Sequence, residues 1–264
     1  MHQLAVFGNP VAHARSPEIH QLFAKQHGIE LNYERILVPP GEFEGYARRY
    51  LEGGAKGFNI TVPYKADAHR FAEQCSEAAV LAQAVNTISI RQGVIHGDNT
   101  DGAGLMKDIS DNLGWTLRDK KVLVLGAGGA VSGVVSNLLG AAPRTVEILN
   151  RTATKAIAIV EQHDDPRLCA IETPSDAYDV IINGTSVALQ GTNLDLPTSI
   201  VSADCCCYDM SYGDSAFLRW CADLGASRLA DGLGMLVEQA ALGFNIWFDL
   251  PVRTSDVIAA LRNR

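Results

Sequence analysis

The chain has 264 residues, a formal net charge of −8 at pH 7 and 47% apolar residues. That length allows one large or two modest domains, and the apolar share is ordinary for a globular protein with a full core. The acidic balance makes nucleic acid an unexpected partner, and no apolar run approaches the roughly 20 residues that span a bilayer, so a membrane is not expected either.

The first predicted elements are a strand over residues 4–7 and a turn at Gly8-Asn9-Pro10. A helix then begins near Ser16, which precedes a proline and an early acid, as N-cap residues often do. Ser16 could also bind a ligand carboxylate at this helix end, but the residues alone favour the capping role. The first ten residues have neither a basic region nor a long apolar stretch, so we expect no signal peptide.

A strand over 33–38, a helix over 42–51 and a strand over 56–62 come next, and this alternation predicts a parallel sheet. In the last of these strands the period of two puts Asn59 and Thr61 on one face. Polar side chains at the carboxyl end of a buried strand mark the place where α/β proteins bind ligands. Lys65 follows and is expected in the loop, where a lone lysine is usually solvated and inert.

Residues 76–84 are predicted as a short helix, and residues 85–90 and 94–97 as a hairpin that turns at Gln92-Gly93. The hairpin ends in the polar turn 98–102, which precedes a helix through Leu113. Asp101 could simply cap that helix. Together with Asn59, Thr61, Lys65 and Asn86, however, it forms a set of polar residues at strand ends.

The second half begins, after a charged link, with a buried strand over 122–125, the glycines Gly126, Gly128 and Gly129, and an apolar segment to residue 139 that we predict as one helix. A glycine turn between strand and helix is the setting in which dinucleotides bind. Val131 replaces the third glycine of the usual fingerprint. The alternative is a glycine-rich turn of any α/β protein.

The next strand, 145–149, ends in Asn150-Arg151-Thr152, with Lys155 one helical turn further on. NAD-binding units place an acidic residue about 20 positions beyond the glycines, where it bonds the ribose. A carboxylate would repel a 2′-phosphate, whereas a guanidinium can bind it. Arg151 therefore favours NADP over NAD, and the alternative is a solvated basic pair at a strand end.

The remaining predicted elements end with a long helix over 235–248 and a terminal helix near Leu261. The strand over 205–210 contains three successive cysteines, Cys205 to Cys207, and no nearby Cys or His pair completes a zinc site. We interpret all six cysteines as reduced thiols of a cytoplasmic protein. The other predicted elements are a helix after Thr152, strands over 169–171 and 179–182, and a helix over 217–224.

The motifs together resemble the shikimate dehydrogenase family, and the resemblance runs from Val6 to about Phe244. So many motifs in one order are far more specific than the glycine turn alone. They are Gly8-Asn9-Pro10 with Ser16-Pro17, Asn59-x-Thr61-x-Pro63-x-Lys65, Ala84-Val85-Asn86-Thr87, Gly97-Asp98-Asn99-Thr100-Asp101-Gly102, Gly126-Ala127-Gly128-Gly129-Ala130, Asn150-Arg151-Thr152, Tyr208-Asp209-Met210, and Ala230-Asp231-Gly232-Leu233-Gly234-Met235-Leu236 with Gln239.

The resemblance implies an α/β fold of two domains. Residues 1–101 with 238–264 would form the substrate domain, and residues 102–237 a Rossmann-like NADP-binding domain, with the C-terminal helices returning to the first. It implies reversible NADPH-dependent reduction of 3-dehydroshikimate to shikimate, in aromatic amino-acid biosynthesis, without a metal. The expected partner is a small-molecule substrate, and the expected assembly is a monomer or a homodimer.

The resemblance also assigns roles to residues. Lys65 and Asp101 would be the catalytic pair, because the alkoxide left by hydride transfer needs a proton donor. Glu77 occupies a place where the family has an acid near the nicotinamide. The substrate would contact Ser16, Asn59, Thr61, Asn86, Tyr212 and Gln239, and the cofactor would contact Gly126, Ala127, Gly128, Gly129, Ala130, Asn150, Arg151, Thr152, Lys155, Met210 and Gly232.

The chain departs from the family pattern at several positions. Ala14 stands where a second carboxylate-binding serine is usual, and it raises the alternative of a paralogue that acts on quinate or a related cyclic polyol acid. A nucleotide-sensing binding protein on the same fold is the other alternative, although sensing needs neither Lys65 nor Asp101. The further departures are Lys155 for arginine, Ser132 for arginine, and Gly184 and Ala188 in the turn after Asn183.

Overall fold

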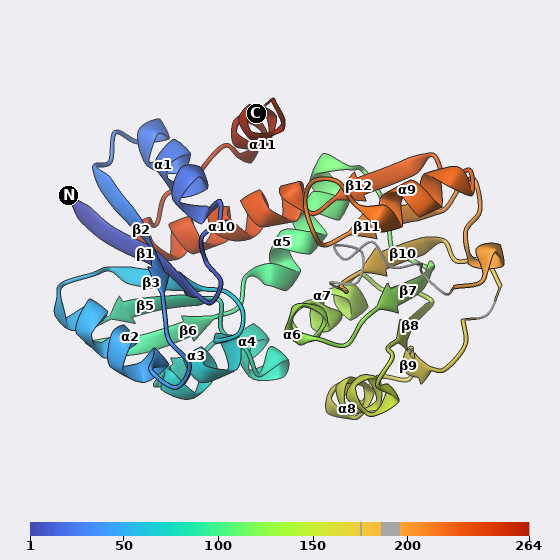
Figure 1. Cartoon of the computed structure of the whole chain (residues 1–264), viewed down its shortest axis with the longest axis horizontal. Coiled ribbons are helices and arrows are strands. Elements are labelled where there is room, and N and C mark those ends of the chain that lie inside the picture. The colour runs from blue at the N-terminus through green and yellow to red at the C-terminus, as the bar shows by residue number, and fades with distance from the viewer. Residues whose placement is uncertain (175, 186–195, 264) are drawn as a thin grey trace. The chain divides into compact units, whose positions relative to one another are not determined.

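The computed structural model describes residues 1–174, 176–185 and 196–263 (Figure 1). The chain forms two compact units, which we call unit 1 (Met1–Gly104 with Val237–Arg264) and unit 2 (Leu105–Leu236). It passes from unit 1 to unit 2 within helix α5 (Asp101–Lys107) and returns within helix α10 (Leu233–Phe248). Among the described residues, no helix is both long and apolar enough to cross a membrane.

Unit 1 contains a six-stranded sheet in the order β2-β1-β3-β5-β6-β4. Strand β1 is parallel to β2 and β3, as predicted, whereas β5 and β6 form an antiparallel hairpin. Gln92 and Gly93 turn the hairpin with φ of 53° and 81°, the positive values that a type I′ turn requires. The strands are β1 (His2–Gly8), β2 (Leu31–Leu37), β3 (Gly57–Ile60), β4 (Gln74–Cys75), β5 (Thr87–Arg91) and β6 (Val94–Asp98).

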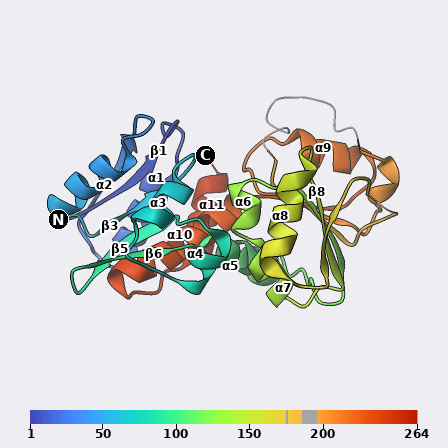
Figure 2. The same ribbon diagram turned by 90° about the horizontal axis from the view of Figure 1, so that it is seen from below.

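Helices cover both faces of this sheet (Figure 1). The alternation along β1 turns Ala5 and Phe7 toward the buried cluster formed with α2 and α3, which lie side by side in both views (Figure 1, Figure 2). Leu4 and Val6 point the opposite way, toward Trp247 of α10. The remaining helices of unit 1 are α1 (Ser16–Gln26), α2 (Phe43–Glu52), α3 (Lys65–Phe71), α4 (Glu77–Ala82) and α11 (Thr254–Arg262).

Unit 2 contains a second six-stranded sheet, in the order β12-β11-β10-β7-β8-β9, and its strand pairs are parallel. Counted along the unit, this is the order 6-5-4-1-2-3 of a Rossmann fold, whose ligands bind where the strand order reverses, beside the first strand. The strands are β7 (Lys121–Leu125), β8 (Thr145–Leu149), β9 (Leu168–Ile171), β10 (Val180–Asn183), β11 (Cys206–Asp209) and β12 (Arg228–Asp231).

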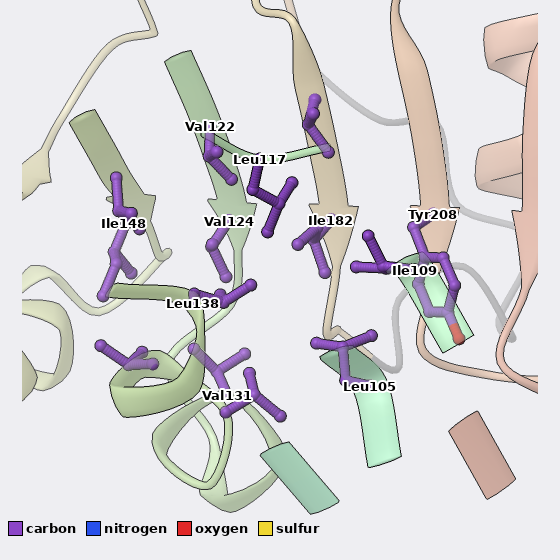
Figure 3. Packing of buried hydrophobic residues seen from close by; sticks show 14 of the residues in the cluster. Leu105, Ile109, Leu117, Val122, Val124, Val131, Leu138, Ile148, Ile182 and Tyr208 are labelled. Atoms are coloured by element: carbon purple, nitrogen blue, oxygen red, sulfur yellow. The ribbon is translucent and has the colours of Figure 1, made fainter. Parts of the chain in front are cut away.

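The core of unit 2 lies on both faces of its sheet. Val122 and Val124 of β7 and Ile182 of β10 pack with Leu138 on one face (Figure 3). Leu123 of β7 points to the other face, where it belongs to the cluster around α9. The helical elements are α6 (Gly129–Ser132), α7 (Val135–Gly140), α8 (Ala153–His163), α9 (Ala216–Asp223), a π-helical turn (Asp108–Asn112) and a 3-10 turn (Thr198–Ile200).

The segment predicted as one helix after the glycine turn is two short helices, α6 and α7. The break falls at Gly133 and Val134, where the Val134 N–H bonds to the Val131 carbonyl three residues back (3.0 Å). Glycine and β-branched valines have weak helix propensity, so this segment tolerates the tighter turn. Val131 is fully buried and still packs into the core (Figure 3).

Candidate functional site

Lys65 and Asp101 form an ion pair in unit 1, with Lys65 Nζ 2.5 Å from Asp101 Oδ2. Lys65 is the first residue of α3, not a loop residue, because the helix starts directly after Pro63-Tyr64 and the Ala68 N–H bonds to the Tyr64 carbonyl. The Lys65 side chain is 20% exposed and that of Asp101 is 8% exposed. The pair is thus shielded from bulk water but remains reachable through the lysine.

The start of α5 aims the Asp101 carboxylate. Asn99 Oδ1 accepts the Asp101 backbone N–H (3.0 Å), and Asn99 Nδ2 donates to the Ala84 carbonyl (3.0 Å). Asp101 is the first residue of α5, and Asn99 accepts its backbone N–H. The Asp101 carboxylate accepts hydrogen bonds on both oxygens, from Lys65 on Oδ2 and from Asn86 Nδ2 on Oδ1 (2.8 Å).

Asn86 and Gln239 meet beside this pair. The Thr100 N–H donates to Asn86 Oδ1 (3.0 Å), and the Thr100 hydroxyl donates to the Gln239 carbonyl (3.0 Å). Gln239 Oε1 lies 3.4 Å from Asn86 Nδ2. A Cβ on Gly104 would lie 2.6 Å from the Gln239 nitrogen, so glycine permits the close approach of α5 to α10. The structure therefore brings Lys65, Asn86, Asp101 and Gln239 together.

Ser16 does not cap helix α1. The helix begins at Ser16 itself, and Arg15 holds the N-cap position without a side-chain capping bond. The Arg15 carbonyl accepts the Ile19 N–H (3.1 Å), so the backbone at Ser16 is already helical. The Ser16 side chain is buried. Burial raises the pKa of Tyr33 well above its ordinary value, with Ser16 opposing the shift, so the phenol stays protonated.

The Asn59 amide is surrounded by protein groups. Its Oδ1 accepts hydrogen bonds from the Tyr33 hydroxyl (2.6 Å) and from His20 Nε2 (3.2 Å). Its Nδ2 donates to the Asn86 carbonyl (3.1 Å) and to Thr87 Oγ1 (3.0 Å). Burial lowers the pKa of His20 to about 3, with the bond to Asn59 opposing the shift, so this histidine is neutral.

Sequence reasoning did not select His20, Tyr33 or Thr87. Thr87 directly follows Asn86 in one of the motifs, but nothing local indicates that its hydroxyl faces Asn59. Thr61, in contrast, was selected, and it lies half-buried just beyond β3. A Cβ on Gly8 would lie 2.4 Å from Thr61 Cγ2, so the glycine of the first motif makes room for that threonine.

A second group of predicted residues surrounds a cavity of about 290 Å³ in unit 2. Gly126 has φ of +105°, a conformation that favours glycine, and its N–H donates to the Leu149 carbonyl (2.8 Å). A Cβ on Gly128 or Gly129 would meet no atom within 4 Å, so this side of the turn is open to a ligand. The lining residues are Gly126, Ala127, Gly128, Leu149, Asn150, Arg151, Thr152, Lys155, Gly184 and Thr185.

The end of this cavity is basic. Arg151 and Lys155 are exposed, and Asn150 shapes the turn by donating from Nδ2 to the Thr152 carbonyl (2.8 Å). Among the described residues that line the cavity, none is acidic. A glycine-lined turn beside two cations fits a phosphorylated adenosine ribose, as the sequence indicated.

Val131, which replaces the third glycine of the usual dinucleotide fingerprint, lies against Gly184, which departs from the family pattern. A Cβ on Gly184 would lie 2.4 Å from Val131 Cγ2 and 3.1 Å from Met210 Sδ. A valine at position 131 therefore requires the glycine at position 184. Gly184 and Thr185 also line the cavity, although they were not among the predicted cofactor-binding residues. Their place in a polar turn directly after a buried strand is the sequence feature that could have indicated this role. Ala188 of the same turn lies outside the described residues.

The other predicted residues lie in different places. Met210 follows β11, and Gly232 packs so closely on it that a Cβ would lie 2.3 Å from the Met210 carbonyl oxygen. Tyr212 is 37% exposed in unit 2. Glu77 is an exposed residue in the first turn of α4, so it belongs to unit 1 and not to the unit of the cavity. Ala130 lies within α6.

The strand order, the glycine turn and the basic cavity define unit 2 as a Rossmann-like dinucleotide-binding unit. The chain is thus a two-unit α/β protein that pairs such a unit with one carrying a partly buried lysine–carboxylate pair. Family models match both units: the shikimate dehydrogenase substrate binding domain over residues 6–88, shikimate/quinate 5-dehydrogenase over residues 107–192, and the shikimate 5′-dehydrogenase C-terminal domain over residues 232–262.

Curated relatives and solved structures give the same family as these family models. The chain is 47% identical to the NADP⁺ shikimate dehydrogenase of Alkalilimnicola ehrlichii, covering 98% of this chain and 97% of that one. An Ael1 enzyme from Pseudomonas putida superposes with a TM-score of 0.94 at 38% identity, over 99% and 98% of the two chains. Shikimate 5-dehydrogenase from Thermus thermophilus, in complex with NADP(H) and shikimate, gives a TM-score of 0.90 at 31% identity, over 100% and 99%.

The chain belongs to the shikimate dehydrogenase family. This confirms the resemblance drawn from the motifs, and it confirms the α/β fold with a Rossmann-like unit.

Proposed function

We propose that the protein is an NADP-dependent shikimate dehydrogenase, which reduces 3-dehydroshikimate to shikimate reversibly in aromatic amino-acid biosynthesis. The observation that carries the proposal is the shielded pair of Lys65 and Asp101, 2.5 Å apart, in a chain whose curated relatives are named for that activity. A binding protein without turnover would not need a proton donor held against a buried carboxylate.

The pair can perform the proton transfer that the reduction needs. When bound, NADPH supplies a hydride to the substrate carbonyl. Lys65 donates a proton to the oxygen on which negative charge develops, and Asp101 holds the lysine in one orientation and stabilises its charged form. Asn86 secures the carboxylate from its other oxygen, so Asp101 cannot rotate away from Lys65 without losing a hydrogen bond.

Polar side chains around the pair supply the substrate contacts in unit 1. We assign substrate hydroxyls to Thr61, Asn86 and Gln239, and the carboxylate to Ser16. The 3.4 Å contact between Asn86 and Gln239 is longer than an ordinary hydrogen bond, so Gln239 Oε1 can turn to a substrate hydroxyl at little cost. Asn86 Nδ2 also donates to Asp101 Oδ1 (2.8 Å) and to Thr100 Oγ1 (2.9 Å), so a substrate hydroxyl that binds Asn86 takes the place of Thr100 Oγ1. The substrate role of Tyr212 and the cofactor roles of Glu77, Met210 and Gly232 stay predictions.

The cavity of unit 2 supplies the NADP site. The open glycine turn from Gly126 to Gly129 accommodates the diphosphate, and Arg151 and Lys155 bind the 2′-phosphate. Asn150 and Thr152 fix the turn that carries Arg151. This arrangement favours NADP over NAD, because only NADP carries the additional phosphate.

Steady-state assays test the proposal. Shikimate with NADP⁺ should give the highest kcat/KM among four combinations of shikimate or quinate with NADP⁺ or NAD⁺. Quinate is the second candidate because Ala14 lacks a hydroxyl, and the Arg35 side chain reaches the same place through a bond from Nε to the Ala14 carbonyl (2.8 Å). Preferred turnover of quinate would replace the proposal, and turnover of neither acid would favour a nucleotide-sensing protein.

We also place the protein in the cytoplasm, as a monomer or a homodimer. All six cysteines are free thiols, which suits a reducing compartment. Light scattering coupled to size-exclusion chromatography decides the assembly, and a larger oligomer would contradict this part of the proposal.

A further inference from the structure

Buried hydrogen bonds in unit 1 form a chain that ends at Asp101. The Tyr33 hydroxyl donates to Asn59 Oδ1 (2.6 Å), and Asn59 Nδ2 donates to Thr87 Oγ1 (3.0 Å). Thr87 Oγ1 donates to Asn86 Oδ1 (3.0 Å), and Asn86 Nδ2 donates to Asp101 Oδ1 (2.8 Å). All five side chains are buried, with Thr87 wholly inaccessible to solvent.

Backbone groups fix the direction of this chain. Asn59 Nδ2 faces the Asn86 carbonyl, which can only accept, so Asn59 Oδ1 must face Tyr33 and His20. Asn86 Oδ1 receives the Thr100 N–H, which can only donate, so Asn86 Nδ2 must face Asp101. A flip of Asn59 would place its oxygen against the Asn86 carbonyl oxygen, and a flip of Asn86 would place its NH₂ against the Thr100 N–H. The Thr87 hydroxyl therefore has one arrangement, in which it accepts from Asn59 and donates to Asn86.

Asn59 has no hydrogen-bonding capacity left for a ligand. Its oxygen accepts two hydrogen bonds, and its nitrogen donates two, which is the full inventory of an amide side chain. An amide that is both buried and satisfied contributes by fixing its neighbours. The neighbour on the side of the Lys65–Asp101 pair is Thr87.

We infer that Thr87 is a positioning residue: its hydroxyl fixes the Asn86 amide, and through it the Asp101 carboxylate that holds Lys65. Asn59 then acts on the site through Thr87 rather than by direct contact with the substrate. The inference rests on the proposed function, because it assigns the effect of Thr87 to turnover of shikimate. Thr87 is not a catalytic residue, since it is fully buried and touches no reacting atom.

The test compares three variants: Thr87→Val, the conservative variant Thr87→Ser and the control Ser89→Ala. Valine keeps the shape of threonine and removes the hydroxyl, so Asn86 loses one of the groups that fix it. We expect kcat for shikimate oxidation to fall about 10-fold or more, because small misplacement of a catalytic group is costly, while KM changes less than about 2-fold. Thr87→Ser keeps the hydroxyl and should restore kcat to within about 2-fold of the wild type.

Ser89→Ala is the matched control. Ser89 lies two residues further along the same strand, is also buried, and its hydroxyl has no hydrogen-bond partner among the described residues. Its removal should leave kcat and KM unchanged. Wild-type kcat in Thr87→Val, a loss of equal size in Ser89→Ala, or failure of Thr87→Ser to restore turnover would each overturn the inference. If Thr87→Val does not fold, Thr87→Cys replaces it, since a thiol is a weak donor, with the same expected loss.

The wild-type assay separates this inference from the proposed function. If the wild type does not oxidise shikimate, the proposed function fails by itself. Crystal structures of Thr87→Val and Thr87→Ser then judge the chain of hydrogen bonds. Rotation of the Asn86 amide away from Asp101 in the valine variant alone supports the inference, and an unchanged contact between Asn86 Nδ2 and Asp101 in both variants overturns it.

Discussion

The two units hold their candidate sites in opposite ways. In unit 1 the polar side chains are buried and satisfy one another, from Tyr33 through Asn59, Thr87 and Asn86 to Asp101. In unit 2 the cavity is lined by backbone at glycines and by exposed cations. The difference agrees with the parts that we propose for the two sites. A proton donor must be fixed before the reaction, whereas a phosphate tolerates mobile cations and needs room for close approach of the backbone.

This contrast makes separate predictions for the two units. Changes in the buried network of unit 1 should alter turnover or acid stability, and changes at the cavity of unit 2 should alter cofactor affinity. A variant in unit 1 that alters only cofactor affinity, or a variant at the cavity of unit 2 that alters only turnover or acid stability, would contradict this contrast.

The largest expected effect is on the acid stability of unit 1. The pKa of His20 is lowered to about 3 by burial, against about 6.5 in the unfolded chain, so the unfolded state binds the proton first. The free energy of unfolding should therefore fall as the pH drops from about 6.5 to 3, by about 5 kcal/mol from this group. In His20→Gln and His20→Phe this contribution should vanish. Urea denaturation at pH 7, 5 and 4 measures it, and parallel pH dependence in all three proteins would contradict it.

The second effect is on turnover. Lys65→Ala removes the proposed proton donor and should reduce kcat by roughly 100-fold or more, while the affinity for NADP⁺ stays nearly unchanged because the proposed cofactor cavity lies in unit 2. Lys25→Ala, at an exposed lysine of the same unit, is the control. Near-normal kcat in the Lys65 variant would remove this residue from the mechanism.

The third effect is on cofactor choice. Arg151→Asp places an anion at the basic end of the cavity and should weaken NADP⁺ binding by about 10-fold or more relative to NAD⁺. Arg144→Asp makes the same charge change just before β8, outside the residues that line the cavity. Titration calorimetry with both cofactors measures the ratio of dissociation constants. Equal losses for NADP⁺ and NAD⁺ would show that Arg151 does not contact the 2′-phosphate.

The smallest effect concerns Ala14. This residue is half-buried, and a serine hydroxyl there could donate to the substrate carboxylate, a bond worth at most about 1.5–3 kcal/mol. Water can take the place of the missing donor, so we expect Ala14→Ser to lower KM for shikimate by about 10-fold or less and to leave kcat largely unchanged. Ala12→Ser, in the exposed part of the same loop, is the control. A higher KM in Ala14→Ser would favour the paralogue that acts on quinate.

Local patterns predicted much of the fold. The apolar runs of β7 and β8 and the turn at Gln92-Gly93 stand where the sequence placed them. The strands that were not predicted are short: β4 has two residues and β12 has four, beginning with an exposed arginine. Two residues are too few to show a period, and only one of the four residues of β12 is buried, so that strand has no buried apolar run by which to predict it.

Some contacts of the candidate site in unit 1 could not be predicted from local sequence patterns, because they join residues far apart in the chain. Lys65, Asn86 and Asp101 were selected because polar residues at strand ends converge in α/β folds. The partners of Asn59 were not, because His20 and Tyr33 lie 39 and 26 residues away in the chain. Such contacts depend on the order of the strands in the sheet and on how α1 packs against it, which no motif of a few residues reports. Local patterns likewise missed that Ser16 lies inside α1 and that Lys65 is helical.

The reactivity of the buried cysteines in unit 2 can be used to measure how often this unit opens locally. Cys205, Cys206, Cys207 and Cys221 are buried around β11 and α9, whereas Cys169 is exposed. The hydrogen bond with Cys207, together with burial, raises the pKa of Cys205, and burial raises that of Cys206, so their reactive thiolates are scarce in the folded unit. Alkylation of these thiols thus requires the sheet of unit 2 to open. The rate of alkylation reports how often the sheet opens. A cofactor that binds only the folded form of unit 2 should slow alkylation as the fraction of protein with bound cofactor rises.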